Sequence, residues 1–333
     1  MSPPLDPTRR WAELGEKPDF AGLLSWSSVP YSEDPADLGE ADVVIVGAPM
    51  DDLVSDEPGT RLGPRAIRAA SSIVGPRLGS SVDPFSSLRL LDYGDAAVRP
   101  GDPAASLNAI GGLVADVAAA GAVPFMFGGD HSVSGPALRA LAAVHGPLGL
   151  VHFDTHIDTG EDVFGVRPSH GTVMHELVVE GTVDPTRYVQ IGLRGYWPGP
   201  REFEWQRSVG ITSMTMDDIA ELGLAAVIEQ ALGAVGTGPA YVSVDIDVID
   251  PSNAPGTGTP EPGGMLPREL LWALGRIGRE LTTIAGADVV EVIPREVGTA
   301  DPTALLADRC LRELLQGIAE RRVIAGRDGD REP

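Results

Sequence analysis

The sequence predicts an α/β fold built on one doubly wound, mostly parallel sheet of eight strands. From residue 41 onward, short β-rich runs alternate with amphipathic segments of helical periodicity. Several runs, such as GLVHF and ADVVIV, are almost continuously apolar, as expected for strands that helices cover on both faces. The 41 glycines and 29 prolines suit the many tight turns that this alternation requires.

The alternation places each expected element in order along the chain. β-rich runs predict strands at residues 42–47, 89–92, 123–127, 148–154, 188–193, 211–216, 240–245 and 284–292. The segments between and after them predict helices at residues 64–72, 104–120, 133–145, 173–180, 202–209, 225–235, 267–280 and 303–321. A strand followed by a helix, repeated in this way, indicates parallel strands joined by crossover helices.

The pattern contains no linker and no repeat between residues 41 and 322, so we expect this region to be a single domain. The Pro-rich residues 1–40 are expected to form an irregular lead segment, packed on the surface or at a subunit contact. Residues 323–333, which end in GRDGDREP, are expected to be a disordered tail.

Composition limits the partners and the compartment of the protein. Acidic residues outnumber basic residues 48 to 25, a net charge of −23 that disfavours nucleic acid and anionic membranes and mildly favours small cations. The single cysteine, Cys310, excludes an intramolecular disulfide and is expected to be a buried thiol. No run approaches the roughly 18 apolar residues of a membrane span. The N-terminus lacks the layout of a signal peptide, so we expect a cytoplasmic protein.

Residues able to bind a metal follow three of the expected strands, and ligands of open parallel sheets bind beyond the carboxyl ends of the strands. Strand 123–127 leads into GGDHS at 128–132, where a glycine turn delivers His131. This motif alone is a weak signal, because an Asp or Ser that caps the next helix would explain most of it.

The fourth strand ends in the motif DTHID at 154–158, which is the strongest signal in the chain. Asp154, His156 and Asp158 are spaced two apart, so their side chains point roughly the same way. Carboxylates gathered at a strand end repel one another unless a cation lies between them. His152 has the same parity but lies deeper, where a hydrogen-bonded histidine is expected rather than a ligand.

Asp245 and Asp247 end the seventh strand and also share a face. Asp250 precedes Pro251 and is expected to form a turn, not to bind metal. The loop at 253–264 is longer than a tight turn requires and is expected to line a substrate pocket, with Thr259 as a contact.

The three strand ends together supply four carboxylates and two imidazoles, which is too many for one tetrahedral zinc ion. This set suits two bridged divalent ions, with Mn²⁺ favoured and Ni²⁺, Co²⁺ or Zn²⁺ as alternatives. Such a pair lowers the pKa of bound water towards neutrality and attracts a cationic substrate.

These motifs resemble those of the ureohydrolase (arginase–agmatinase) family, in its agmatinase and guanidinobutyrase branch. The matching stretches are residues 47–68, GGDHS at 128–132, DTHID at 154–158, SHGT at 169–172, SVDIDVIDPSNAPGTGTPEPGG at 243–264 and ADVVEVIP at 287–294. The resemblance implies a three-layer αβα sandwich around a mostly parallel eight-stranded sheet. It also implies hydrolysis of a guanidino group to an amine and urea by two Mn²⁺ ions, bound by His131, Asp154, His156, Asp158, Asp245 and Asp247.

The resemblance further implies roles for other residues. His170 corresponds to a proton-shuttling histidine, Glu291 to the carboxylate that binds the guanidinium, and Asp158 is expected to serve catalysis as well as the metal. The alternatives are a surface-loop imidazole at His170 and a buried partner of Arg295 at Glu291. The family also suggests a homo-oligomer, commonly a trimer or hexamer.

The substrate is less well determined than the chemistry. Arginases bind the amino-acid head group with an Asn and an Asp, and this chain has Thr159-Gly160 and Gly195 at those places, which argues against arginine. A small cationic guanidino compound, agmatine or a guanidino acid, fits better. Its distal end is expected to contact Tyr196, Trp197 and the acidic loop of Glu161. The alternative is that this loop is solvated and the two aromatic residues pack between subunits.

Two departures from the family pattern concern the substrate and remove no ligand. They are Thr155 and the run 294–296, and they leave open a larger specialised guanidino metabolite. Two other classes of protein remain as alternatives: an amide deacetylase with one zinc ion, and a non-enzymatic family member that has lost ligands.

Overall fold

The computed structural model describes residues 21–71, 75–197 and 199–329, and it confirms the predicted fold class. Its centre is an eight-stranded sheet in which every paired strand is parallel. The order across the sheet is β2-β1-β3-β8-β7-β4-β5-β6. In chain order the strands are β1 Val43–Gly47, β2 Leu90–Asp95, β3 Val123–Phe127, β4 Leu148–Phe153, β5 Val183–Leu193, β6 Thr212–Thr215, β7 Pro239–Asp245 and β8 Thr283–Val290.

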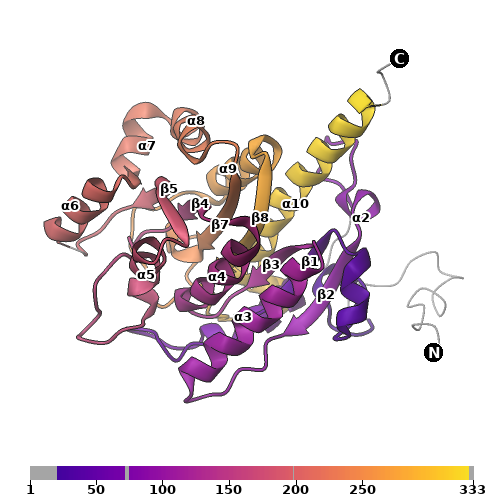
Figure 1. The fold of residues 1–333 in the computed structure, drawn as a ribbon, viewed down its shortest axis with the longest axis horizontal. Coiled ribbons are helices and arrows are strands. Elements are labelled where there is room, and N and C mark those ends of the chain that lie inside the picture. Colours follow the sequence, from indigo (N-terminus) through magenta and orange to yellow (C-terminus); the bar gives the residue numbers. More distant parts are fainter. Residues whose placement is uncertain (1–20, 72–74, 198, 330–333) are drawn as a thin grey trace, which may run out of the picture.

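Helices cover both faces of the sheet and complete three layers (Figure 1). One face packs against α1, α8, α9 and α10, and the other packs against α3, α4 and α5. The α-helices are α1 Gly63–Ala70, α2 Pro84–Ser87, α3 Pro103–Ala119, α4 Ser134–His145, α5 Val173–Val179, α6 Pro200–Val209, α7 Met216–Leu222, α8 Leu224–Val235, α9 Pro267–Glu280 and α10 Pro302–Gly329. In the described part of the chain, every helix is too short or too polar to cross a lipid bilayer.

The side-chain alternation of the strands produces these two cores. In β1, Val43 and Ile45 pack with the α8–α10 side, whereas Val44 and Val46 pack with the α3–α5 side. All four are fully buried, which explains why this strand has no polar residue in its centre. Cys310 of α10 is also fully buried.

Within the described residues, all eight expected strands and all eight expected helices are present, with shifted ends and two additional α-helices, α2 and α7. Residue 72 of the expected helix 64–72 lies outside the described residues. The expected strand 211–216 extends too far, because Met216 begins α7. Thr215 and Asp218 form a capping box there, each side chain binding the other's backbone N–H, and this box starts the helix. In the expected tail 323–333, residues 323–329 belong to α10 and residues 330–333 lie outside the described residues.

The described part of the lead segment, residues 21–40, is integrated into the core. Trp26 is fully buried, and its indole N–H donates to Asp308 of α10 at 2.7 Å. Its backbone N–H donates to Asp92 at 2.8 Å. Asp92 also accepts two hydrogen bonds from the buried guanidinium of Arg68, both at 2.8 Å. The segment therefore closes over a buried ion pair between α1 and β2.

We expect Arg68→Met to destabilise the fold by about 3–5 kcal/mol, because it leaves the buried Asp92 carboxylate without its charge partner. Arg89→Met is the control: Arg89 is exposed and its pair with Asp42 is long, at 3.4 Å, so its loss should cost less than about 1 kcal/mol. Chemical denaturation measures both free energies of unfolding. Equal losses in the two variants would contradict a stabilising role for the buried pair.

Candidate metal centre

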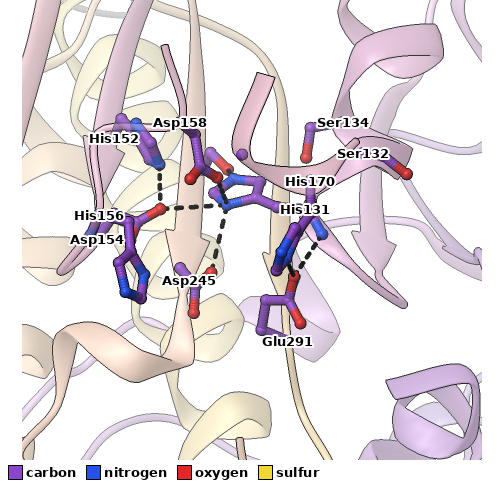
Figure 2. Close-up of polar contacts among 12 residues, drawn as sticks. His131, Ser132, Ser134, His152, Asp154, His156, Asp158, His170, Asp245 and Glu291 are labelled. Carbon is purple, nitrogen blue, oxygen red and sulfur yellow. Dashed lines mark hydrogen bonds and ion pairs between the residues drawn. The ribbon is translucent and has the colours of Figure 1, made fainter. Parts of the chain in front are cut away.

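Four neighbouring strands deliver the candidate site. The order β3-β8-β7-β4 places the carboxyl ends of these strands side by side at the middle of the sheet. His131 follows β3, Asp154 follows β4, Asp245 ends β7 and Glu291 follows β8. Figure 2 shows these side chains pointing toward one another. Residues that lie up to 160 positions apart in the chain therefore share one buried cluster.

The first group of ligand atoms surrounds the imidazole of His131. Its Nδ1 atom lies 3.0 Å from a carboxylate oxygen of Asp158, 3.2 Å from one of Asp154 and 3.3 Å from one of Asp245 (Figure 2). All four side chains are at least nine-tenths buried. Among the described residues, Nδ1 of His131 makes no hydrogen bond.

The second group lies on the other side of Asp154. Nδ1 of His156 is 3.0 Å from Oδ2 of Asp247 and 3.6 Å from Oδ1 of Asp154. Asp154 thus presents Oδ2 to the first group and Oδ1 to the second. Two compact clusters of potential ligand atoms share this carboxylate: one comprises His131, His152, Asp154 and Asp158, and the other Asp154, His156 and Asp247. Asp245 joins the first through its contact with His131.

The hydrogen bonds of His131 show that its free nitrogen is suited to bind a cation. Its Nε2 atom lies 2.9 Å from the hydroxyl of Ser243, and that hydroxyl donates to Asp288 at 2.7 Å. Because the Ser243 proton is committed to Asp288, Nε2 of His131 must be the donor, and Nδ1 of the neutral ring carries a lone pair. Asp288 also accepts from Ser134 and Tyr241, at 2.5 and 2.9 Å. A lone pair that faces three carboxylates requires a cation between them.

The pKa shifts lead to the same requirement for positive charge. Burial lowers the pKa of His131, but its three carboxylate neighbours outweigh burial and raise that pKa well above its usual value. Burial is likewise outweighed at His156, whose pKa the charge of Asp247 and the Asp154 carboxylate raise to about 12. Burial and the neighbouring charges of Asp247 and Asp154 raise the pKa of Asp245 well above its usual value. In the absence of metal, protons supply the positive charge that the cluster requires.

Three segments of the site have backbones that tolerate little change. A Cβ atom at Gly129 would overlap the backbone carbonyl of Met50, so only glycine allows this approach before His131. Asp158 and Glu291 adopt positive φ values of 50° and 62°, which are uncommon for residues other than glycine. Such strain persists where surrounding contacts fix it, and here it lies at two candidate functional residues.

Glu291 and His170 form a pair beside the two groups. One oxygen of Glu291 accepts from Nδ1 of His170 and from the backbone N–H of His131, each at 2.8 Å (Figure 2). Burial lowers the pKa of His170, but Glu291 outweighs it and raises that pKa to about 9. Nε2 of His170 accepts a hydrogen bond from the backbone N–H of Ser55 at 3.1 Å. Arg295 pairs with Glu57, so the alternative of an Arg295–Glu291 pair is wrong.

Of the residues expected to contact the distal end of a substrate, two lie near the candidate ligands and the other two are exposed. Thr259 lies near Asp247, with 3.4 Å between their oxygens, and the ring of Trp197 lies 6.2 Å from the ring of His156. Tyr196 is 99% exposed, and the exposed Glu161 pairs with Arg201 at 3.5 Å. Tyr196 and Trp197 line a cavity of about 470 Å³, together with Thr155, Ile157, Leu193, Arg194, Gly195, Phe203, Thr215, Met216, Asp217, Glu261 and Pro262.

His152 and Asp250, which the sequence does not predict to be ligands, have other partners. Both ring nitrogens of His152 are engaged, one with Asp154 at 2.7 Å and the other with the hydroxyl of Tyr188 at 2.8 Å. Asp250 accepts hydrogen bonds from Ser252 and Gly263 in the turn, and these lower its pKa to about 2.

The sequence alone did not reveal the buried polar residues that orient the candidate ligands through hydrogen bonds. Asp288 is the main example: it interrupts the apolar strand β8 and lies beside Ser243 in the register of β7 and β8. A carboxylate in a fully buried strand is a detectable signal, because such a group needs several donors. Identifying those donors required the neighbouring strand, which the local pattern does not specify.

We expect Asp245→Asn to change the pH dependence of the metal-free protein. A carboxyl whose pKa is raised on folding stabilises the fold below about pH 4 and loses this contribution as pH rises towards its folded pKa. The metal-free wild type should therefore lose stability as pH rises above about 4, with a steeper slope than the variant. Thermal unfolding after chelation measures this difference.

Added Mn²⁺ at about 100 times its dissociation constant should stabilise the wild type by about 2.7 kcal/mol. The same addition should stabilise Asp245→Asn far less, whereas the control Asp250→Asn should respond like wild type. Identical pH slopes and metal responses in wild type and Asp245→Asn would contradict the assignment of Asp245 to the cluster.

Comparison with known proteins agrees with this geometry. Residues 41–316 match the model of the Arginase family. The chain is 42% identical to a guanidinopropionase from Pseudomonas aeruginosa, over 92% of this chain and 95% of the relative. It is 39% identical to a mitochondrial agmatinase from Gallus gallus, over 91% and 87% respectively. The solved structure of a proclavaminate amidino hydrolase from Streptomyces clavuligerus aligns with a TM-score of 0.86 at 39% identity, covering 92% of this chain and all of that one. This chain belongs to the arginase family.

Proposed function

We propose that the protein is a binuclear metal-dependent amidinohydrolase that cleaves a linear guanidino compound to an amine and urea. The observation that carries the proposal is the meeting of four carboxylates and two imidazoles at neighbouring strand ends, with the Glu291–His170 pair beside them. An amide deacetylase with one zinc ion would not need two groups that share a carboxylate. A member that had lost its ligands would not retain all six.

Two Mn²⁺ ions are the cofactors we propose, with Ni²⁺ or Co²⁺ as alternatives, because carboxylate oxygens outnumber imidazole nitrogens. His131, Asp154, Asp158 and Asp245 would bind one ion, and Asp154, His156 and Asp247 the other. When bound, the ions supply a nucleophile from water at neutral pH. The lone pair on Nδ1 of His131, which makes no hydrogen bond within the described residues, supports this assignment.

Glu291 and His170 would act on the substrate itself. Glu291 is fixed by His131 and His170 through one oxygen, and its carboxylate is suited to bind a planar guanidinium. This contact would orient the guanidinium carbon and lower the barrier by proximity. His170, whose pKa is raised to about 9 beside Glu291, would donate the proton that the departing amine requires.

The contacts of the distal loops support a substrate other than arginine. Thr159 stands where arginases place an anchoring Asn, and its hydroxyl is buried and accepts a hydrogen bond from Gln206. The backbone at Gly195 lies against Glu261. Agmatine and the guanidino acids lack the amino-acid head group that such anchors bind. The cavity of about 470 Å³ beside Thr155 and Trp197 also has room for a larger guanidino metabolite, which is our second candidate.

We also propose that residues 41–322 form one catalytic domain, that the protein is a cytoplasmic homo-oligomer, and that its partner is a small guanidino substrate. The match of residues 41–316 to one family model supports the single domain. The expected trimer or hexamer rests on the family resemblance.

Urea release identifies the substrate. After Mn²⁺ loading, we expect urea from agmatine, 4-guanidinobutyrate or 3-guanidinopropionate, and much less from arginine, because Thr159 and Gly195 replace the residues that anchor its head group in arginases. Fastest turnover of arginine would contradict the reading of Thr159 and Gly195. Urea from none of the linear compounds would favour the larger metabolite.

His170→Ala should retain both metal ions and lower turnover by roughly 10²–10⁴-fold, since it removes the proton donor and no ligand. His145→Ala, which changes an exposed histidine at the end of α4, is the matched control. Metal content and urea release are measured on the same samples. Wild-type turnover in His170→Ala would show that the shuttle role is wrong.

A further inference from the structure

A chain of buried hydrogen bonds runs from the shared carboxylate Asp154 to helix α6. Nε2 of His152 lies 2.7 Å from Oδ2 of Asp154, and Nδ1 of His152 lies 2.8 Å from the hydroxyl of Tyr188. Tyr188 accepts from the amide of Gln190 at 2.8 Å, and Gln190 accepts from the amide of Gln206 at 2.7 Å. The side chains of all five residues are fully buried.

The donor and the acceptor of each hydrogen bond in this chain can be assigned, because one contact is with a group that can only accept. Nε2 of Gln190 lies 2.6 Å from the backbone carbonyl of Ile157, which can only accept, so this atom is the amide nitrogen. The Gln190 amide therefore also donates to Tyr188, and the Tyr188 hydroxyl must give its own proton to Nδ1 of His152. Nε2 of His152 consequently carries a proton and donates it to Asp154.

The outer end of the chain has the same polarity. The oxygen of Gln190 faces Gln206, so Gln206 presents its nitrogen and donates. The oxygen of Gln206 then accepts from the hydroxyl of Ser213 in β6, at 3.0 Å. The Gln206 amide also donates to Thr159 at 2.9 Å, in the loop that follows the DTHID motif. Every link thus donates toward Asp154, and donors aligned in this way strengthen one another.

This geometry excludes His152 from the set of ligands even though it lies in a group that could bind an ion. Its inner nitrogen carries a proton and cannot bind a cation at the same time. Its contact is with Oδ2 of Asp154, the oxygen that faces His131 in the first group.

We propose that His152 is a positioning residue for the metal centre, kept as an Nε2–H donor by Tyr188, Gln190 and Gln206. Its hydrogen bond fixes Oδ2 of Asp154, the oxygen that faces His131, so the affinity of the first group for its ion depends on it. The chain also ties the loop of Thr159 and helix α6, which follows Trp197, to the same carboxylate. The inference rests on the proposed metal-binding function.

The test is a Mn²⁺ titration by calorimetry and electron paramagnetic resonance, which needs no substrate. In His152→Gln the side-chain amide takes the place of Nε2 and can still donate to Asp154, whereas the shorter His152→Asn places its amide near Nδ1. We expect His152→Asn to lower the affinity for one of the two ions by roughly 10–100-fold and to leave the affinity for the other nearly unchanged. His152→Gln should restore most of that affinity.

Tyr188→Phe removes one hydroxyl and keeps the ring, so it is the variant least able to disturb folding. It should lower the affinity for the same ion, but by less than His152→Asn does, because the Gln190 amide remains 3.3 Å from Nδ1 of His152. Tyr93→Phe, at another buried tyrosine, is the matched control and should bind both ions like wild type. Thermal unfolding of the metal-free variants shows that each is folded.

Wild-type affinity for both ions in His152→Asn and Tyr188→Phe would overturn the inference and leave the proposed function standing. Equal weakening in His152→Gln and His152→Asn would also overturn it, because it would mark the ring nitrogen as a ligand. If wild type binds one ion or none, the proposed function itself fails.

Discussion

The structure depends on one electrostatic constraint: the carboxylates of Asp154, Asp158, Asp245 and Asp247 are buried together at the carboxyl ends of neighbouring strands. Burying such charges together is costly unless positive charge lies between them. In the absence of metal, His131 and His156 supply that charge as protonated imidazoles. Two divalent ions would balance the four carboxylates and free both imidazoles to act as ligands. Without a cation, the buried carboxylates therefore repel one another at the place where the two proposed ions would bind.

The local sequence placed Asp154, His156 and Asp158 close together, but strand alternation is not the cause. Strand β4 ends at Phe153, and Asp158 has a φ of 50°, so the loop after the strand brings these side chains together. Glu291 was different, because its position depends on β8 pairing between β3 and β7, and no local pattern specifies sheet order. Its role had to come from the family resemblance. The end of the sixth strand failed for a related reason, since the capping pair Thr215–Asp218 overrides a β-rich run.

The least predictable residues are those that act through others. Asp288 reaches the centre through Ser243, which determines which nitrogen of His131 is free. Gln206 reaches it through three buried side chains from another part of the sheet. Neither residue has a motif, because each is defined by partners on other elements. The residues at the cavity mouth are also less constrained than the ligands, as the exposed Tyr196 shows, and substrate choice can change there while the chemistry is retained.

The central claim is that two ions share one carboxylate at this sheet edge. Anomalous X-ray diffraction from a Mn²⁺-loaded crystal, recorded at the manganese absorption edge, tests it most directly. The account predicts two anomalous peaks, one beside Nδ1 of His131 and one beside Nδ1 of His156, with Asp154 contacting both. A single peak, or a peak that contacts His152 in place of Asp154, would contradict it.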